Sequence, residues 1–407
     1  MASRELRVLT LNCWGLAVVS KNREERMRHI AKELSKGRYD IVALQEVWLA
    51  KDYEMIQEMT KDVLPYSHYF HSGMVGGGIC VLSKGPIIDT FYYPFRLNGY
   101  CHRILQGDWY AGKMIGMCAI QHQGITINVY TTHLHALYGP SLDPSLDEPL
   151  PHRLVQAFEL SEFVQHTSAG SDLVLVMGDL NTEPQSLAGR IIKSNGGLTD
   201  AWEVRENKDD NQPGTTCETA SNAFTFIKTR YYHDASPEGG RIDYVLYRRN
   251  PKTIQIQCKE SQLTMGKIPG ANGLNYSDHE GVEAAFEIQD VTDSATNSLW
   301  YVDVNRLQAL KDLLPQMQRA KESAISGRLW FLARALCTII LIIFLSCVSD
   351  TGYSVINVVL GMVHVVLILA AAFFFCVGVI VKQAEKNVYV GIEKDVRLRI
   401  ERLQDQK

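Results

Sequence analysis

Two long apolar stretches near the C-terminus differ sharply from the rest of the chain. The first runs from 330 to 348 and is interrupted by Arg334, and the second runs from 355 to 381 without a formal charge. A helix needs about 20 apolar residues to cross a bilayer, and a run of that length is apolar on every face, unlike an ordinary surface helix. The pattern predicts a transmembrane helical hairpin over 329–382, with the short link Ser349–Ser354 between its helices.

Charged residues around this hairpin predict its orientation. The link carries only the acidic Asp350, whereas the outer flanks carry the basic residues Arg319, Lys321, Arg328, Arg334, Lys382 and Lys386. Positively charged flanks stay on the cytosolic side of a membrane. We therefore expect a two-pass integral membrane protein with its N-terminal domain in the cytosol, in the endoplasmic reticulum or another internal membrane.

The polar tail over 383–407 has its own periodicity. Val388, Ile392, Val396 and Ile400 recur every four residues, which is typical of an amphipathic helix. We expect a cytosolic amphipathic tail that lies at the membrane or pairs with a partner. Self-association through the C-terminal helices is one such pairing.

Residues 1–290 alternate between strand and helix patterns. Predicted strands include 6–11, 41–44, 79–83, 114–121, 126–132, 242–248 and 254–261, and predicted helices cover 23–35 and 153–166. Hairpins mixed with helices favour two packed, largely antiparallel sheets with helices on both outer faces. A helical linker over 291–328, interrupted by Pro315, follows this domain.

Charge and cysteine content narrow the class of protein. The 407 residues carry a formal net charge of -4, so no basic field favours nucleic acid as a partner. Nine cysteines occur without a C-x-x-C spacing, and the N-terminus lacks the apolar core of a secretory signal. We expect reduced thiols in a domain that faces the cytosol.

Polar residues follow or begin several of the predicted strands. They are Asn12, Glu46, His133, Asp179, Asn181, Asp243, Asp278 and His279. Each alone is most often a turn former, a helix cap or an ion pair inside a sheet. Taken together they favour one cleft, because strand ends in a sheet-based protein expose their side chains to a shared site.

This ordered set resembles the endonuclease/exonuclease/phosphatase superfamily, the fold of pancreatic deoxyribonuclease. The resemblance covers residues 1 to about 290 and rests on Asn12, "QE" at 45–46, His133, "GDLN" at 178–181, "RID" at 241–243 and "SDH" at 277–279. It implies an α/β fold, a four-layer sandwich of two mixed β-sheets flanked by helices. It also implies a catalytic phosphodiesterase domain over 1–290 that cleaves phosphoesters with Mg²⁺.

The motifs "LNCWG", "LQEVW", "GDWYAGK", "THLHA" and "RIDYVLY", together with the double membrane span, resemble the type-one neutral sphingomyelinases. This resemblance implies a phospholipase C type hydrolysis of sphingomyelin to ceramide and phosphocholine, with lyso-phosphocholine lipids as further candidate substrates. Two alternatives stay open: a nuclease or inositol-phosphate phosphatase of the same fold, and a non-catalytic membrane scaffold.

The resemblance also implies roles for the polar residues. A hard cation such as Mg²⁺ prefers carboxylate oxygen, so we expect Glu46 to be the main ligand, assisted by Asn12. His279 would accept the proton of the attacking water. Its imidazole would be oriented by Asp243 or by Asp278, which the sequence does not separate.

Three further residues would act on the phosphoryl group. His133 and Asn181 would donate hydrogen bonds to its oxygens, and Asp179 would position the water or the substrate.

Aromatic residues and one lysine are candidates for substrate binding. A quaternary ammonium headgroup binds well over aromatic faces, so Trp109, Tyr110 and Tyr138 are candidates for a choline site or a membrane contact. Lys113 is a candidate for contact with the lipid phosphate, although the complete phosphate-loop pattern is absent around it.

Overall fold

The computed structural model describes residues 3–138, 147–209, 212–225, 239–291, 304–348 and 354–405. The contacts divide the chain into two compact units, Met1–Ala309 and Leu310–Lys407. The link predicted at Ser349–Ser354 lies almost entirely outside the described residues. The predicted division into linker, hairpin and tail stays a prediction.

One six-stranded sheet of the first unit has the order β11-β12-β1-β2-β4-β3. Its strands are β1 (Arg4–Asn12), β2 (Ile41–Gln45), β3 (Tyr66–Phe70), β4 (Ile79–Ser83), β11 (Ile254–Thr264) and β12 (Gly281–Asp290). Only β1 and β2 run parallel, and the other neighbours are antiparallel. The sheet is therefore mixed, with its parallel pair in the middle.

The other six-stranded sheet repeats this plan with the order β5-β6-β7-β8-β10-β9. Its strands are β5 (Ile87–Pro94), β6 (Met114–His122), β7 (Ile125–His133), β8 (Leu173–Asp179), β9 (Thr199–Asp200) and β10 (Asp243–Arg249). Here β7 and β8 form the central parallel pair. In both sheets the parallel pair ends at polar residues.

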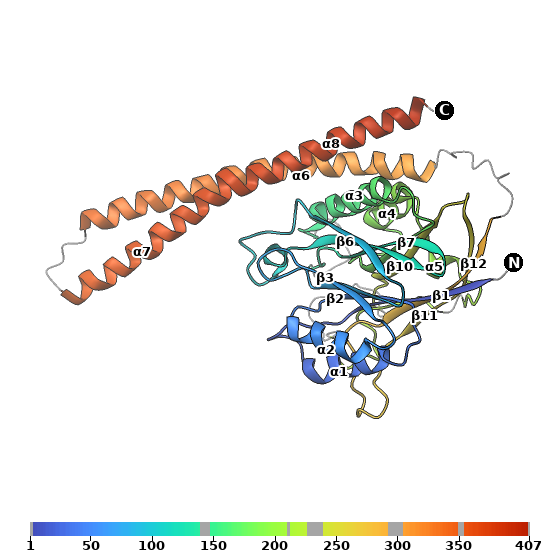
Figure 1. Cartoon of the computed structure of the whole chain (residues 1–407). Helices are drawn as coiled ribbons and strands as arrows, with labels where there is room; N and C mark the ends of the chain where they lie inside the picture. Colours follow the sequence, from blue (N-terminus) through green and yellow to red (C-terminus); the bar gives the residue numbers. More distant parts are fainter. Residues whose placement is uncertain are drawn as a thin grey trace. The chain divides into compact units, whose positions relative to one another are not determined.

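The two sheets pack face to face and helices cover their outer faces (Figure 1). The inner core contains residues of both sheets, such as Val8 and Phe286 from one and Val129 and Leu175 from the other. The helices are α1 (Arg23–Leu34), α2 (Ala50–Thr60), α3 (Leu150–Thr167), α4 (Leu187–Gly196) and the short α5 (Ala201–Val204), with a 3-10 turn η1 (Asp108–Tyr110). Central strands such as β8 are buried along their whole length, which explains their nearly continuous apolar runs. The predicted four-layer sandwich is confirmed.

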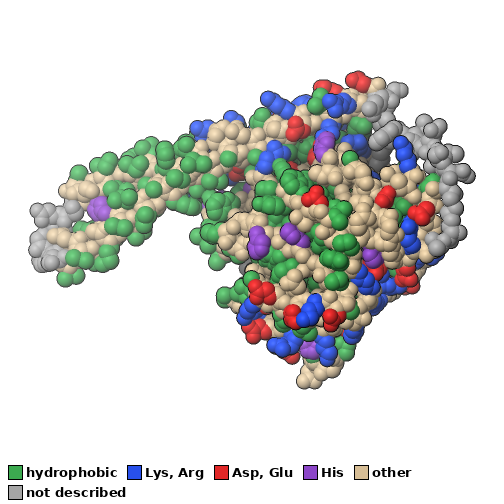
Figure 2. All heavy atoms as spheres, in the orientation of Figure 1, with side chains coloured by type: hydrophobic (Ala, Val, Ile, Leu, Met, Phe, Trp, Pro, Cys, Tyr) green, Lys and Arg blue, Asp and Glu red, His purple; other side chains and the backbone are tan. Residues whose placement is uncertain are grey.

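The second unit is built from long helices. The helix α6 (Val304–Val348) begins in the first unit, and α7 (Ser354–Cys376) continues through the π-helical turn η2 (Val377–Val381) into α8 (Lys382–Asp405). Both helical segments contain a window long and apolar enough to cross a membrane, and most of that window is exposed. Figure 2 shows hydrophobic side chains covering these segments. A buried core helix would instead hide its apolar side chains.

The amphipathic tail pairs within its own chain. Lys321 of α6 forms an ion pair with Glu393 of α8 at 2.8 Å, and Arg328 donates to Gln383 at 2.7 Å. Ser346 and His364 approach to 3.0 Å further along the same antiparallel register. The tail was predicted to lie on the membrane or to pair with a partner, and in the structure its partner is α6.

Candidate active site

Strand register brings three of the predicted site residues side by side. In the second sheet, Asp179 at the end of β8 is the register partner of His133 on β7 and of Asp243 on β10. These residues are far apart in sequence, yet they lie opposite one another on adjacent strands. The site therefore follows from the parallel β7–β8 pair and the antiparallel β8–β10 pair.

The first sheet contributes an amide and a carboxylate. Asn12 ends β1, and Glu46 directly follows β2 with a left-handed backbone, φ 56°. The Nδ2 atom of Asn12 lies 3.0 Å from Glu46 Oε1 and 3.0 Å from Asp179 Oδ2. One buried amide therefore connects carboxylates from the two sheets.

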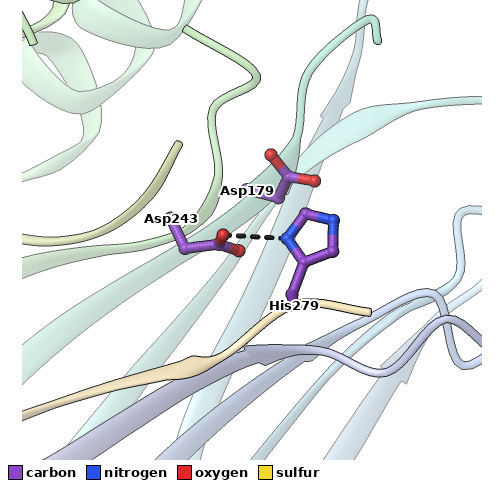
Figure 3. A group of neighbouring side chains, drawn as sticks. All are labelled: Asp179, Asp243 and His279. Carbon is purple, nitrogen blue, oxygen red and sulfur yellow. Dashed lines mark hydrogen bonds and ion pairs between the residues drawn. The ribbon is translucent and has the colours of Figure 1, made fainter. Parts of the chain in front are cut away.

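His279 and Asp243 form the second connection between the sheets. The imidazole Nδ1 of His279 lies 2.9 Å from Asp243 Oδ2, and the other ring nitrogen points away from this carboxylate (Figure 3). Asp278 instead accepts a hydrogen bond from the hydroxyl of Ser277 at 3.2 Å. Of the two orienting groups that the sequence left open, Asp243 is the one that contacts the ring.

The pKa of His279 is raised, although the side chain is buried. Burial alone would lower the pKa of His279, but the neighbouring Cys217 and Asp243 raise it well above the ordinary value. Burial raises the pKa of the Cys217 thiol to about 11, so that the thiol is neutral near pH 7. The Asp243 carboxylate is therefore the charge that stabilises the imidazolium.

His133 and Asn181 surround Asp179. The Nε2 atom of His133 is 3.4 Å from Asp179 Oδ2, and the backbone N–H of Asn181 donates to Asp179 Oδ1 at 2.9 Å. Burial, reinforced by the charge of Lys113, lowers the pKa of His133 well below its ordinary value. His133 is therefore a neutral hydrogen-bonding group.

The donor set of the site fits a divalent cation. Burial and the nearby Asp243 raise the pKa of Asp179 to about 7, and burial together with Glu46 raises that of Asp278 to about 6. Such shifts mean that more carboxylates are buried here than nearby cations compensate. Asp179, Asp243 and His279 also place one ligand atom each within 4.8 Å of one another, which is close enough to hold a metal ion.

The predicted substrate-binding residues lie in a neighbouring cluster. Trp109 is partly exposed and packs edge-to-face on Tyr110 with ring centroids 5.0 Å apart. The Tyr138 hydroxyl donates to Asp108.

Lys113 of the same cluster is buried and pairs with Asp108, and it donates to the Leu134 carbonyl at 2.7 Å. It supports the strand end that carries His133, and its contact with a lipid phosphate stays a prediction.

Sequence reasoning missed a buried arginine that organises the loops of the site. The guanidinium of Arg26 on α1 donates to the carbonyls of Cys13, Trp14, Lys21 and Tyr276 at 2.7–3.0 Å. It thereby ties the loop after Asn12 to the loop before His279. One signal was available: Arg26 precedes the buried Ile30 by one helical turn, so it lies on the apolar face of the helix.

A second missed residue, Thr216, bonds the backbone next to both His279 and Asp243. Its hydroxyl accepts from the backbone N–H groups of Ile242 and Asp243 at 3.1 and 3.2 Å. Its carbonyl accepts from Glu280 N–H at 2.7 Å. No sequence signal marks Thr216, because it lies in a polar loop without periodicity.

Comparison with known proteins identifies the family. Residues 9–279 match the model of the Endonuclease/Exonuclease/phosphatase family, which is about two thirds of the chain. The chain belongs to this family. It is similar to human "Sphingomyelin phosphodiesterase 2", with 37% identity over 288 residues, 70% of this chain and 66% of the relative. It is also similar to the "Inositol phosphosphingolipids phospholipase C" of Schizosaccharomyces pombe, with 35% identity over 302 residues, 70% of this chain and 69% of the relative.

A solved structure supports the fold. A beta toxin from Staphylococcus aureus with bound magnesium ions superposes with a TM-score of 0.50 at 18% identity, over 69% of this chain and 99% of the toxin. At that identity the likeness concerns the fold alone.

Replacing Arg26 tests its part in organising the site. Arg26→Met leaves four loop carbonyls without their donor, and it should lower the free energy of unfolding by about 3 kcal/mol. Thermal unfolding of the detergent-solubilised protein measures the loss. Arg28→Met changes an exposed arginine of the same helix and should leave the transition within the error of the measurement. Equal transitions for the two variants would contradict the assigned role of Arg26.

Proposed function

We propose that the chain hydrolyses the phosphodiester of sphingomyelin to ceramide and phosphocholine. The observation that carries the proposal is the buried His279–Asp243 pair, set 2.9 Å apart beside the Asn12-bridged carboxylates. The similarity to a human sphingomyelin phosphodiesterase supports the substrate class. Two helices long enough to cross a membrane fit an enzyme that acts on lipid.

An inositol phosphosphingolipid is the second candidate substrate. It is favoured by the similarity to the fission yeast phospholipase C, and it differs from sphingomyelin only in the group beyond the phosphate. The exposed face of Trp109 beside Tyr110 favours choline, because a quaternary ammonium binds over aromatic rings. A nuclease is disfavoured by the net charge of -4.

Mg²⁺ is the proposed cofactor, with Glu46 as its principal ligand and Asn12 in support. Nδ1 of His279 and Oδ2 of Asp243 already share a hydrogen bond, so a metal ion there would have to displace their proton. When bound, the cation would offset the charge of the phosphate and lower the pKa of the nearby imidazolium.

His279 would accept the proton of the attacking water. Asp243 holds Nδ1 in hydrogen-bonded form, which leaves Nε2 to accept that proton, and the carboxylate stabilises the imidazolium as it forms. Hydrolysis then joins the water oxygen to phosphorus and breaks the bond between phosphorus and the ceramide oxygen. The ceramide oxygen takes a proton from solvent, and the imidazolium returns its proton to solvent.

Three residues would act on the phosphoryl group. Neutral His133 would donate from a ring N–H, and Asn181 would donate from its side-chain amide, which at present donates to the Leu134 carbonyl at 3.0 Å. Such donors stabilise charge that grows on the oxygens in the transition state. Asp179 would orient the water, since its carboxylate lies between Asn12 and His133.

We further propose that the catalytic unit lies in the cytosol, on the endoplasmic reticulum or another internal membrane. The basic residues outside the hairpin and the acidic link support this orientation. Protease accessibility of the link in sealed microsomes measures it, and cleavage from the cytosolic side would contradict it.

Release of phosphocholine from vesicles tests the proposed reaction. Purified full-length protein should release phosphocholine from sphingomyelin in the presence of Mg²⁺ and stop when EDTA is added. His279→Ala should reduce the rate by at least about 100-fold, whereas His166→Ala, at an exposed histidine, should not change it. Release of inositol phosphate from inositol phosphoceramide, without release of phosphocholine from sphingomyelin, would select the second substrate. A rate unaffected by EDTA would contradict the metal requirement.

The dependence of the rate on Mg²⁺ concentration tests the metal ligand. Glu46→Gln removes a charged oxygen ligand and should raise the Mg²⁺ concentration needed for half-maximal activity by at least about tenfold. Asp243→Asn should lower the maximal rate with little change in that concentration. If Asp243→Asn raised that Mg²⁺ concentration and Glu46→Gln did not, the metal would lie among Asp179, Asp243 and His279 instead.

A further inference from the structure

Three loops of the catalytic unit each expose two consecutive apolar residues. Val18 is 96% exposed and Leu105 is 102% exposed, so these side chains are as accessible as in an extended chain. We call the six residues the apolar rim: Val18, Val19, Met74, Val75, Ile104 and Leu105. They lie in the loops between β1 and α1, between β3 and β4, and between β5 and η1.

Each of these loops leads directly to the candidate active site. The first loop follows Asn12 at the end of β1. The second ends at Gly78, whose carbonyl accepts from the N–H of Val47, the residue after Glu46, at 2.9 Å. The third leads to Lys113, which holds the strand end beside His133 through the Leu134 carbonyl. The residues of the rim therefore belong to loops that connect directly to the site.

The second loop is also joined to η1 and to the residues that follow it. Val75 N–H donates to the Tyr110 carbonyl at 3.2 Å. Gly73 and Gly112 approach so closely that a Cβ atom on Gly73 would lie 2.5 Å from the Cα of Gly112. Met74 and Val75 are thus held beside η1, which directly follows the loop that carries Ile104 and Leu105.

At the opposite end of the second sheet, the described loops carry no exposed apolar pair, and Ile88 of β5 is exposed there singly. The loops at 123–124, 168–172 and 250–253 join the other ends of its strands. These loops have the sequences "QG", "SAGSD" and "NPKT", and none of their residues is an exposed large hydrophobic side chain. Another exposed pair of the described residues, Phe91 and Tyr92, is aromatic and lies within β5 rather than in a loop. Exposed aliphatic pairs on described loops therefore distinguish the end of the domain that carries the site.

We propose that the apolar rim inserts into the surface of a lipid bilayer and places the site over its lipid substrate. The bilayer is the favoured occupant because the same chain has two helices of membrane-spanning length. Aliphatic pairs on three separate loops suit a fluid partner, whereas a protein partner is better matched by one continuous apolar face. This inference rests on the proposed lipid hydrolysis, because it concerns access to the same site.

The inserted rim would spare the substrate a large displacement. Burying aliphatic side chains among acyl chains is favourable, and it brings the opening of the site to the level of the lipid headgroups. The phosphate could then reach Glu46 and His279 while the acyl chains stay in the membrane.

Comparison of a bilayer substrate with a water-soluble one tests the rim. The double variant Ile104→Ser/Leu105→Ser, in the full chain reconstituted into phosphatidylcholine vesicles, should hydrolyse bilayer sphingomyelin about tenfold more slowly than wild type. Its rate on a monomeric short-chain sphingomyelin should stay within about twofold of wild type. Val204→Ser, at an exposed apolar residue of α5, is the matched control and should change neither rate.

Failure of the membrane-insertion inference can be distinguished from failure of the proposed function. Equal loss on both substrates would show that the rim supports the fold, and unchanged rates on both would show that it does not contact lipid. Either result overturns the inference. A wild-type protein that hydrolyses neither substrate would instead contradict the proposed function.

Discussion

The hydrogen bond between His279 and Asp243 is the interaction on which the site depends. It joins the loop before β12 in one sheet to the first residue of β10 in the other, and both side chains are buried. A buried charge is costly unless it is paired, so each partner stabilises the charged form of the other. Arg26 and Thr216 fix the backbones on either side. The imidazole is therefore held in place by the packing of the two sheets.

Much of this architecture was predictable from local pattern. Strands such as β1, β2 and β8 are buried apolar runs that end in a polar residue, and the hairpin β6–β7 turns at Gly124 as its sequence indicates. The helix α2 was missed because its buried positions are Asp52, Ile56 and Thr60. Two of those three are polar, so the helix shows no apolar stripe. The strand β5 was missed because most of its residues face solvent.

The contacts of the site depend on the register between strands that are distant in the sequence. Local sequence patterns do not reveal that register. The sequence offers both Asp243 and Asp278 as partners of His279, and only Asp278 is its neighbour in the chain. Only the pairing of Asp243 with Asp179 across β10 and β8 brings its carboxylate to the ring. The same limit applies to Lys113, which the sequence presents as a candidate for contact with the lipid phosphate and the structure buries against Asp108. The tail is a further example. Its apolar face predicted a helix, but the sequence did not reveal that α6 is its antiparallel partner.

The protonation of His279 reports whether its hydrogen bond to Asp243 organises the site. Nitrogen-15 NMR of the selectively labelled full-length protein reports both the hydrogen on Nδ1 and the pKa of the ring. Without divalent metal, Nδ1 should carry a hydrogen throughout the titration, and the pKa of the ring should lie well above the ordinary value for histidine. That pKa should fall when Asp243 is replaced by Asn. An ordinary pKa that Asp243→Asn leaves unchanged, or a neutral ring that carries its hydrogen on Nε2, would contradict this role of the hydrogen bond.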